Sequence, residues 1–344
     1  MGESCANGGI LRGAYMNFEK ITEADLEKCR GLVEKCREEA RKRLVGQEYL
    51  IDGIMTAFIA GGHILLEGVP GLAKTLAIKT FSEISGLDFK RIQFTPDLLP
   101  ADVIGTLIYE HERATFSARK GPIFANVVLA DEINRAPAKV QSAMLEAMEE
   151  KQVTIGEKSY PLPVPFFVLA TQNPIEQEGT YNLPEAELDR FLMKLIVTYP
   201  EPEDELQIVK TCGNASKIPV NTVLSAKDLN EIRGISEHIV CDDAIIEYIV
   251  KIVSVTRPSE KKQSEYDITR YITIGASPRA GIALLQCAKA CALMAGRSFV
   301  IPEDIQAVSH GVLRHRIGLS YEAAADGVSS DDIISRILEY VPIP

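Results

Sequence analysis

The spacing of hydrophobic residues changes along the chain and marks out its first helices. Thr22 and Asp25 have the spacing of a capping box, in which each side chain bonds a backbone N–H of the same first turn. Hydrophobic residues then recur every three or four positions, and Glu, Lys and Arg fill the opposite face. The buried face of this helix is expected to carry Leu26, Cys29, Val33 and Cys36. A second helical run, 51–59, ends at Gly61 and Gly62.

Five later runs are apolar at almost every position instead of at alternate positions. They are 63–67, 89–94, 127–130, 166–170 and 193–197. Such runs are typical of strands that are covered on both faces. Helical patterns separate most of them, which predicts an α/β fold with a parallel five-stranded sheet wrapped by helices. Two stretches, 100–124 and 152–165, fit the sheet poorly and are expected to project from it as insertions, the second as a hairpin around Gly156.

Pro200 and Pro202 predict a break between two domains, because neither a strand nor a helix continues through them. Beyond the break the pattern is helical to the end. One helix is expected to begin at Ser277-Pro278 and another at Pro302. The buried contacts of the first are expected from Ile282, Leu285 and Leu293, with Gly296 ending it. We therefore predict a flexible leader over 1–21, a sheet domain over 22–199 and an all-α lid over 200–344.

Composition narrows the classes of function. The 344 residues are 46% hydrophobic and 25% charged, as in ordinary globular proteins. A net charge of −11 argues against a broad nucleic-acid surface or binding to an anionic membrane. No apolar run approaches the roughly 20 residues that span a bilayer, so membrane insertion is not expected. The residues before Met16 do not resemble a secretory signal, and the seven scattered cysteines fit small buried hydrophobes better than a metal or redox site. We expect a cytoplasmic protein.

The apolar run 63–67 leads directly into Gly68-Val69-Pro70-Gly71-Leu72-Ala73-Lys74-Thr75. A strand, a glycine-containing loop, a lysine, a hydroxyl residue and then a helix form the order of a phosphate-binding loop. Lys74 would contact the β- and γ-phosphates, and Thr75 would offer its hydroxyl to Mg²⁺. Ala73 stands where a second glycine is usual, although a residue entering a helix can carry a methyl group. By itself this stretch could equally be a loop that joins a strand to a helix.

Two further strands end in polar residues. The run 127–130 ends in Asp131 and Glu132, which after a phosphate-binding loop predict a Mg²⁺ ligand and a general base for the attacking water. Taken alone, they are equally explained as solvated acids. The run 166–170 leads to Asn173, which could polarise that water or contact the γ-phosphate, although an Asn before Pro174 is also common in turns.

Of two arginines near predicted helix ends, only the one in the second domain is a candidate for a contact to the γ-phosphate by its position alone. Arg279 lies in the first turn of a predicted helix, where a cation opposes the helix dipole, and such local conflicts occur at functional sites. From the second domain its guanidinium could reach the γ-phosphate and couple domain closure to the nucleotide; an exposed salt bridge is the alternative. Arg190 closes a helical run that begins at Pro184, where a structural role is the default.

Together these runs resemble AAA+ ATPases, and specifically the MoxR family. The resemblance rests on the loop 68–75, on 131–137 (DEINRAP), on 170–174 (ATQNP), on 183–191 (LPEAELDRF) and on 276–279 (ASPR), in that order along the chain. It implies an αβα nucleotide-binding domain followed by a helical lid, with ATP bound between them. It also implies that the two insertions are the helix-2 insert and the hairpin before the first sensor strand.

The resemblance assigns a role to each candidate residue. Lys74 and Thr75 are implied as phosphate and Mg²⁺ residues, Asp131 as the Mg²⁺ carboxylate and Glu132 as the base. Asn173 and Arg279 are implied as sensors 1 and 2, and Arg190 as an arginine finger inserted into a neighbouring subunit's site. The implied nucleotide contacts are Gly46, Gln47, Gly68, Val69, Pro70, Gly71, Leu72, Ala73, Lys74, Thr75, Leu76 and Arg279, with Gly46 and Gln47 near the adenine.

A finger supplied in trans implies a homo-oligomer, with a hexameric ring as the family's form. The family further implies chaperone-like remodelling or maturation of partner complexes, acting with proteins that carry a von Willebrand factor A domain. Two other hypotheses remain. One is a nucleotide-gated scaffold with negligible turnover, which would not need Glu132 or Arg190. The other is a DNA-remodelling motor, which the acidic composition disfavours.

Overall fold

A computed structural model gives the fold. It describes residues 21–69, 71–72, 74–112, 114–173, 180–181, 183–210, 214–258 and 268–344. The predicted leader therefore lies outside the described residues except for Ile21, and Pro70 and Ala73 of the loop also lie outside them.

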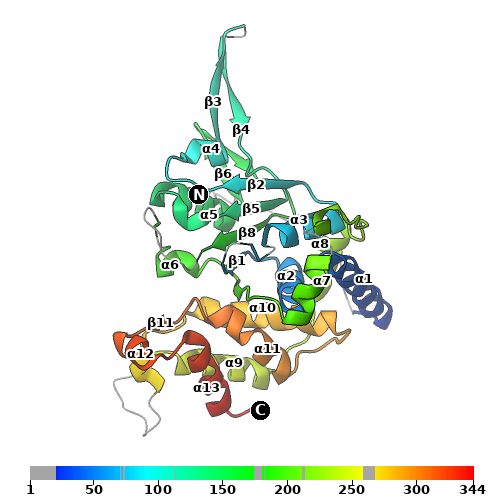
Figure 1. Cartoon of the computed structure of the whole chain (residues 1–344), viewed down its shortest axis with the longest axis vertical. Coiled ribbons are helices and arrows are strands. Elements are labelled where there is room, and N and C mark those ends of the chain that lie inside the picture. The colour runs from blue at the N-terminus through cyan, green and yellow to red at the C-terminus, as the bar shows by residue number, and fades with distance from the viewer. Residues whose placement is uncertain are drawn as a thin grey trace, which may run out of the picture.

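The centre of the molecule is the predicted parallel sheet of five strands, in the order β2-β5-β8-β1-β9 (Figure 1). The strands are β1 (Ile64–Glu67), β2 (Phe89–Gln93), β5 (Val127–Asp131), β8 (Phe167–Gln172) and β9 (Met193–Ile196). The register pairs Gln93 with Asp131 and Glu67 with Gln172. Parallel strands all end at the same edge, so the polar residues that follow β1, β5 and β8 are brought together there.

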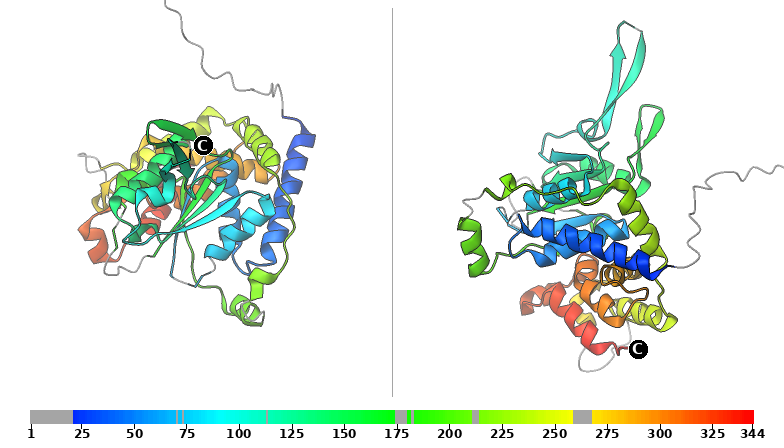
Figure 2. Two further views of the ribbon diagram at one scale, coloured as in Figure 1. Left: turned by 90° about the horizontal axis from the view of Figure 1, so that it is seen from above. Right: turned by 90° about the vertical axis from the view of Figure 1, so that its right-hand side faces the viewer.

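Alternate residues of the central strands enter two different cores, as expected for strands covered on both faces. Leu129 and Leu169 pack with α1, α2 and α3, in a core that continues into the C-terminal helices. Val128 and Val168 pack with α5 on the other face. The covering helices are α1 (Glu23–Arg41), α2 (Glu48–Ala60), α3 (Lys74–Ser85) and α5 (Ala138–Glu150). Figure 2 shows α1 lying along the side of the molecule.

The first helix begins and the second helix ends as predicted, although α2 begins at Glu48, three residues before the predicted run. Thr22 and Asp25 form the capping box of α1, and its four predicted core residues are buried. Gly61 ends α2 with a φ of +75°, a left-handed conformation that glycine adopts without a Cβ clash.

Both predicted insertions project from the same end of the sheet (Figures 1 and 2). The first consists of α4 (Pro100–Ile104) and the hairpin β3 (Gly105–Glu110) and β4 (Thr115–Lys120). The second is the hairpin β6 (Gln152–Ile155) and β7 (Lys158–Pro161), with Gly156 in its turn. The two hairpins touch where Gly156 meets Leu107.

The region after the proline break is mostly helical. Its helices are α7 (Pro202–Lys210), α8 (Ala226–Glu237), α9 (Asp243–Val255), α10 (Pro278–Met294), α11 (Pro302–Leu313), α12 (Tyr321–Asp326) and α13 (Ser330–Tyr340), with 3₁₀ turns at Asn214–Lys217 and Ile268–Tyr271. Within this region α8 packs against α2 of the sheet domain as well as against α10. Arg233 of α8 donates a 2.7 Å hydrogen bond to the carbonyl oxygen of Phe58.

Two details of the helical prediction were wrong. A short antiparallel pair, β10 (Ile272–Ile274) and β11 (Gly318–Leu319), joins the segments before α10 and after α11. These are two to three residues long, too short to show a period in the sequence. Ile282 is 58% exposed, whereas Leu293 is fully buried, because only one face of α10 meets the core.

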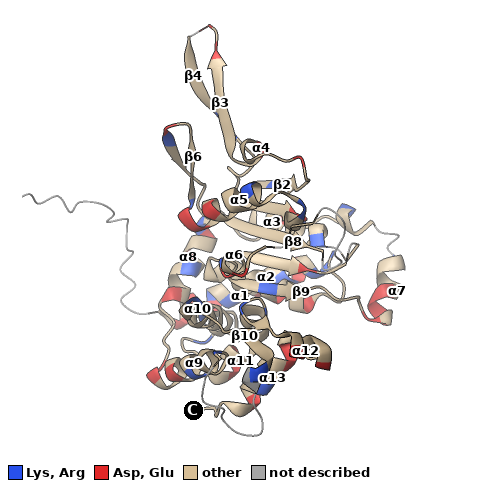
Figure 3. Ribbon diagram, turned by 90° about the vertical axis from the view of Figure 1, so that its left-hand side faces the viewer, with Lys and Arg blue, Asp and Glu red and all other residues tan. Residues whose placement is uncertain are grey.

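Charged residues are distributed over the whole molecule. Figure 3 shows Lys and Arg interspersed with Asp and Glu, with acidic residues in the first turn of α7. Within the described ranges no helix is both long and apolar enough to cross a bilayer.

Candidate nucleotide site

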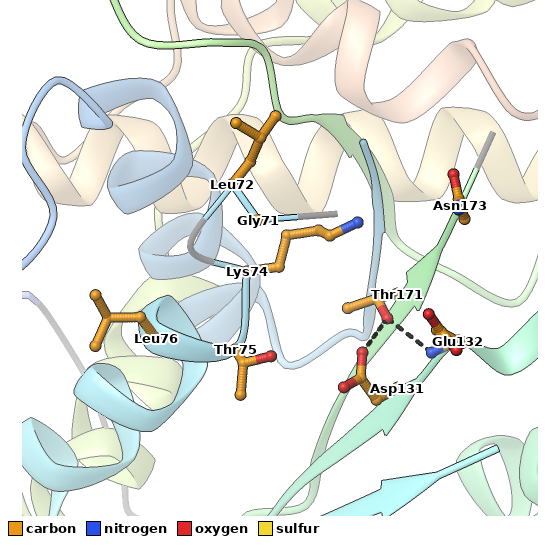
Figure 4. Close-up of a pocket in the computed structure, with 9 residues that line it drawn as sticks. All are labelled: Gly71, Leu72, Lys74, Thr75, Leu76, Asp131, Glu132, Thr171 and Asn173. Carbon is orange, nitrogen blue, oxygen red and sulfur yellow. Dashed lines mark hydrogen bonds between the residues drawn. The ribbon is translucent and has the colours of Figure 1, made fainter. Parts of the chain in front are cut away.

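A cavity of about 400 Å³ lies at the carboxyl edge of the sheet, beside the glycine-containing loop. Its lining residues come from the loop and α3, from the end of β5 and from the end of β8: Gly71, Leu72, Lys74, Thr75, Leu76, Asp131, Glu132, Thr171 and Asn173. Figure 4 shows Lys74 and Thr75 on one side and the two carboxylates with Asn173 on the other. The volume is within the usual range for small-molecule sites.

The Lys74 side chain turns back over the glycine-containing loop. Its ammonium group donates a 2.5 Å hydrogen bond to the carbonyl oxygen of Gly68. Burial lowers the pKa of Lys74, while the negative charges of Asp131, Glu132 and Glu67 act in the opposite direction. A partly desolvated ammonium group beside a glycine-containing loop, at the first residue of α3, is suited to bind an anion such as a polyphosphate.

Asp131 is tightly held at the end of β5. One carboxylate oxygen accepts a 2.6 Å hydrogen bond from the Thr171 hydroxyl on β8. The other accepts two from the Arg91 guanidinium on β2, at 3.0 and 2.6 Å. The carboxylate is only 12% exposed. Neighbouring strands on both sides therefore fix its orientation.

Glu132 follows in an unusual backbone conformation, with a φ of +55°. Left-handed residues other than glycine are uncommon and cluster at functional sites. The Glu132 N–H donates a 2.8 Å hydrogen bond to the Thr171 hydroxyl. Its carboxylate accepts hydrogen bonds from Gln93 at 3.1 Å and from Arg135 at 3.2 Å. Thr171 thus joins both acids to β8.

Asn173 lines the cavity directly after β8. Its carbonyl oxygen lies 3.5 Å from the side-chain nitrogen of Asn134. Asn173 and the predicted base Glu132 therefore line the same cavity, at the ends of adjacent strands.

The two predicted arginines lie elsewhere. The Arg190 Nε lies 3.2 Å from one oxygen of Glu149, and the Arg279 guanidinium lies 2.9 Å from the other. Neither arginine is among the residues that line the cavity. Arg279 therefore pairs with a carboxylate of α5 in this structure, and its predicted γ-phosphate contact stays a prediction, as does the role of Arg190.

Gly46 and Gln47, predicted to lie near the adenine, are also outside the cavity lining. Gly46 has a φ of +67°, and a Cβ at this position would overlap the carboxylate of Asp204 on α7. The glycine is thus needed for the close approach of α7, and an adenine contact stays a prediction.

In the structure four residues contact the predicted acids or the predicted arginines, although the sequence had given them no role: Arg91, Gln93, Thr171 and Glu149. Arg91 and Gln93 lie on β2, and their importance comes from the pairing of β2 with β5, which no local pattern reveals. Thr171 was visible two residues before Asn173, but nothing in the sequence showed that its side chain faces the acids.

The donor set fits a bound Mg²⁺. Among the described residues no cluster of three or more His, Cys, Asp or Glu could hold a metal alone. Mg²⁺ is usually held by one or two protein oxygens together with phosphate and water. The Asp131 carboxylate and the Thr75 hydroxyl, on facing sides of one cavity, match that pattern (Figure 4).

Comparison with known proteins agrees with this geometry. Residues 63–193 match the family model described as the ATPase family associated with various cellular activities (AAA), and residues 264–337 match the AAA lid domain. The chain is 46% identical to the chaperone MoxR1 of Mycobacterium tuberculosis, over 91% of this chain and 82% of the relative. It is 43% identical to the uncharacterized protein YeaC of Bacillus subtilis, over 91% and 95% of the two chains.

A solved structure supports the same assignment. The crystal structure of a candidate ATPase from Cytophaga hutchinsonii superposes with a TM-score of 0.86 at 48% identity, covering 94% of this chain and 98% of that one. With a parallel sheet, a helical C-terminal region and both matching domains, this chain belongs to the MoxR family of AAA+ ATPases.

Proposed function

We propose that this protein hydrolyses ATP in a Mg²⁺-dependent reaction, as a subunit of a ring, and uses the cycle to remodel or mature partner proteins. The observation that carries the proposal is the cavity in which Lys74 and Thr75 face Asp131 and Glu132. Membership of an ATPase family and the similarity to a protein named as a chaperone support it.

Each residue of the cavity has a chemical task in this proposal. Lys74 and the backbone N–H groups of the loop bind the phosphates of ATP. Asp131 and Thr75 hold Mg²⁺, which neutralises phosphate charge when bound. Glu132 accepts the proton of the attacking water, and Asn173 orients that water.

Several internal contacts must change when the substrate binds. Lys74 leaves the carbonyl oxygen of Gly68 to reach a phosphate. Glu132 must direct a carboxylate oxygen towards water, so its bonds to Gln93 and Arg135 are exchanged or rearranged. These are exchanges of polar partners within one site, which keeps their net free-energy cost small.

In this proposal Arg190 makes hydrolysis in one subunit depend on its neighbour. It lies outside its own chain's cavity and is 29% exposed, on a salt bridge with Glu149. In this proposal the guanidinium leaves Glu149 and enters the cavity of a neighbouring subunit. In known GTPases an arginine supplied in this way contributes on the order of 10³–10⁵ in rate. Hydrolysis would then require assembly, for which a hexameric ring is our proposal.

The catalytic assignment is tested by replacing Glu132 with Gln. We expect steady-state ATP turnover to fall at least about 100-fold while Mg·ATP affinity is retained, because general-base catalysis contributes about 10²–10⁴ in rate. The control is Glu150→Gln, an exposed glutamate at the end of α5, which should turn over ATP like the wild type. Intact turnover in the Glu132 variant would overturn the assignment.

The alternative of a binding scaffold is tested by Arg190→Ala in a single-turnover assay. We expect a large loss of the hydrolysis rate and little change in nucleotide affinity. A scaffold would show equal, negligible hydrolysis with or without Arg190.

We propose that the partner is a protein with a von Willebrand factor A domain. The Glu132→Gln protein, which should trap ATP, is the form to use in a pull-down. If it captures no more of such a protein with ATP than with ADP, the partner assignment is wrong.

A further inference from the structure

The residue next to Arg190 connects two parts of the chain that are far apart in sequence. One oxygen of the Asp189 carboxylate accepts a 2.6 Å hydrogen bond from Arg316, beyond the end of α11. The other accepts a 2.9 Å hydrogen bond from the Ser277 hydroxyl, at the start of α10. Asp189 is 17% exposed and lines no part of the nucleotide cavity. Both of its carboxylate oxygens thus accept hydrogen bonds from groups of the lid.

Arg316 holds the backbone on both sides of Arg190. Its guanidinium is 3% exposed and donates to the carbonyl oxygens of Asp189 at 3.1 Å, Phe191 at 2.6 Å and Leu192 at 3.1 Å. Burial lowers the pKa of Arg316, and the hydrogen bond to Asp189 opposes that effect. A buried cation requires its counterion, so the position of the Asp189 carboxylate is strongly specified.

Ser277 carries the connection to the second arginine. Its hydroxyl oxygen is the N-cap of α10 and accepts a 3.1 Å hydrogen bond from the N–H of Arg279. Arg279 and Arg190 then meet again on the two oxygens of Glu149. The two arginines are thus joined twice: through Asp189 and Ser277 at their backbones, and through Glu149 at their guanidinium groups.

We propose that Asp189 is a positioning residue for the arginines, which ties Arg190 to the first turn of α10 so that movement of the lid moves Arg190. The proposal rests on the proposed function, because it concerns how Arg190 is presented to a neighbouring site. It names Ser277 and Arg316 as the groups through which Asp189 acts. Glu149 binds both guanidinium groups until they move to the phosphates of bound ATP.

The first test removes the bond between Asp189 and α10, together with the N-cap hydrogen bond that the same hydroxyl accepts from Arg279. Ser277→Ala removes the hydroxyl and leaves the Asp189–Arg316 pair intact, and Ser277→Thr restores a hydroxyl. The matched control is Ser329→Ala, which removes the same kind of N-cap from α13, where Ser329 accepts a 3.1 Å hydrogen bond from the N–H of Asp332. All three are assayed for kcat and for KM of ATP.

We expect Ser277→Ala to lower kcat about tenfold with KM within twofold, since small misplacements of catalytic groups cost up to about 100-fold. Ser277→Thr and Ser329→Ala should stay within twofold of the wild type. A purely structural N-cap would affect Ser277→Ala and Ser329→Ala alike. Equal kcat values for these two variants would overturn the proposal.

The second test uses mixed assemblies. A chain with Asp189→Asn keeps its own nucleotide site but presents Arg190 poorly, whereas Glu132→Gln keeps Arg190 but has an inactive site. In a random equal mixture about one quarter of the interfaces pair an intact site with an intact arginine. We expect the mixture to recover up to about a quarter of wild-type turnover, above either variant alone, and Asp189→Asn to bind Mg·ATP like the wild type.

A mixture of Arg190→Ala with Glu132→Gln separates the possible failures. If this mixture recovers turnover and the Asp189→Asn mixture does not, the inference on Asp189 is wrong and the proposed function stands. If neither recovers, delivery of Arg190 between subunits is wrong, and the inference falls with it. Should Asp189→Asn not fold, the Ser277 series decides the question.

Discussion

Two buried threonines allow the site geometry to be tested with one chemical change. Thr171 is 1% exposed, and its hydroxyl both donates to Asp131 and accepts from the N–H of Glu132. Thr80 on α3 is fully buried, and its hydroxyl has no hydrogen-bond partner among the described residues. Replacing either by Val keeps the side-chain shape and removes the hydroxyl. The two variants should therefore differ only in what the hydroxyl contacts.

The expected change in the free energy of unfolding follows from those contacts. A hydrogen bond to a charged group contributes about 1.5–3 kcal/mol, and a buried N–H left without a partner costs about 1–3 kcal/mol. We expect Thr171→Val to lower the free energy of unfolding by about 3 kcal/mol, since Glu132 keeps some access to water. Thr80→Val loses no hydrogen bond and should be neutral or up to about 1 kcal/mol more stable.

Catalysis should separate the two variants further. Without the Thr171 hydroxyl nothing fixes the N–H of Glu132, whose backbone is in the left-handed region. We expect kcat of Thr171→Val to fall about 10–100-fold, because a displaced catalytic group costs up to about 100-fold in rate. Thr80→Val should turn over ATP like the wild type.

The assays are urea unfolding and steady-state ATP turnover. With a denaturant dependence of about 3 kcal/mol/M, Thr171→Val should shift the urea midpoint down by about 1 M. Thr171→Ser keeps the hydroxyl and loses a methyl group, so it should retain activity at a cost of about 1 kcal/mol. An unchanged midpoint for Thr171→Val, or an equal loss for Thr80→Val, would refute the reasoning.

Three further predictions concern pH, metal and thiols. Burial lowers the pKa of His63 to about 4, below its usual 6.5, so neutral His63 contributes stability that is complete above pH 6.5 and is lost towards pH 4. Replacing His63 with Gln should remove roughly 2 kcal/mol of the difference in stability between pH 7.5 and pH 5, measured by urea unfolding at these two values. Arg91 and Mg²⁺ should compete for the Asp131 carboxylate, so Arg91→Met, which removes this cation, should lower the Mg²⁺ concentration for half-maximal turnover about 2–5-fold. A higher Mg²⁺ requirement would contradict this competition. Burial raises the pKa of Cys29 to about 11 and of Cys36 to about 12, so mass spectrometry should find both thiols unmodified by iodoacetamide at pH 8 until the protein unfolds.

Much of the fold was determined by local sequence patterns. The apolar strand runs predicted all five strands of the sheet, because strands covered on both faces need hydrophobic residues at nearly every position. Thr22, Ser277 and Gly61 marked helix ends, because capping and left-handed turns depend on a few neighbouring residues. The loop 68–75 and the acids after β5 pointed to one site, since parallel strands end at a common edge.

The tertiary structure decided which side chains meet across strands and domains. Arg91 and Gln93 reach the acids because β2 pairs with β5, and Thr171 does so because β8 lies on the other side of β5. Arg190 and Arg279 share Glu149, and Asp189 joins Ser277 to Arg316, only because the lid packs against the end of α5 and the segment between β8 and β9. Such contacts join residues tens to more than a hundred positions apart, and periodicity and capping act only within a turn or two.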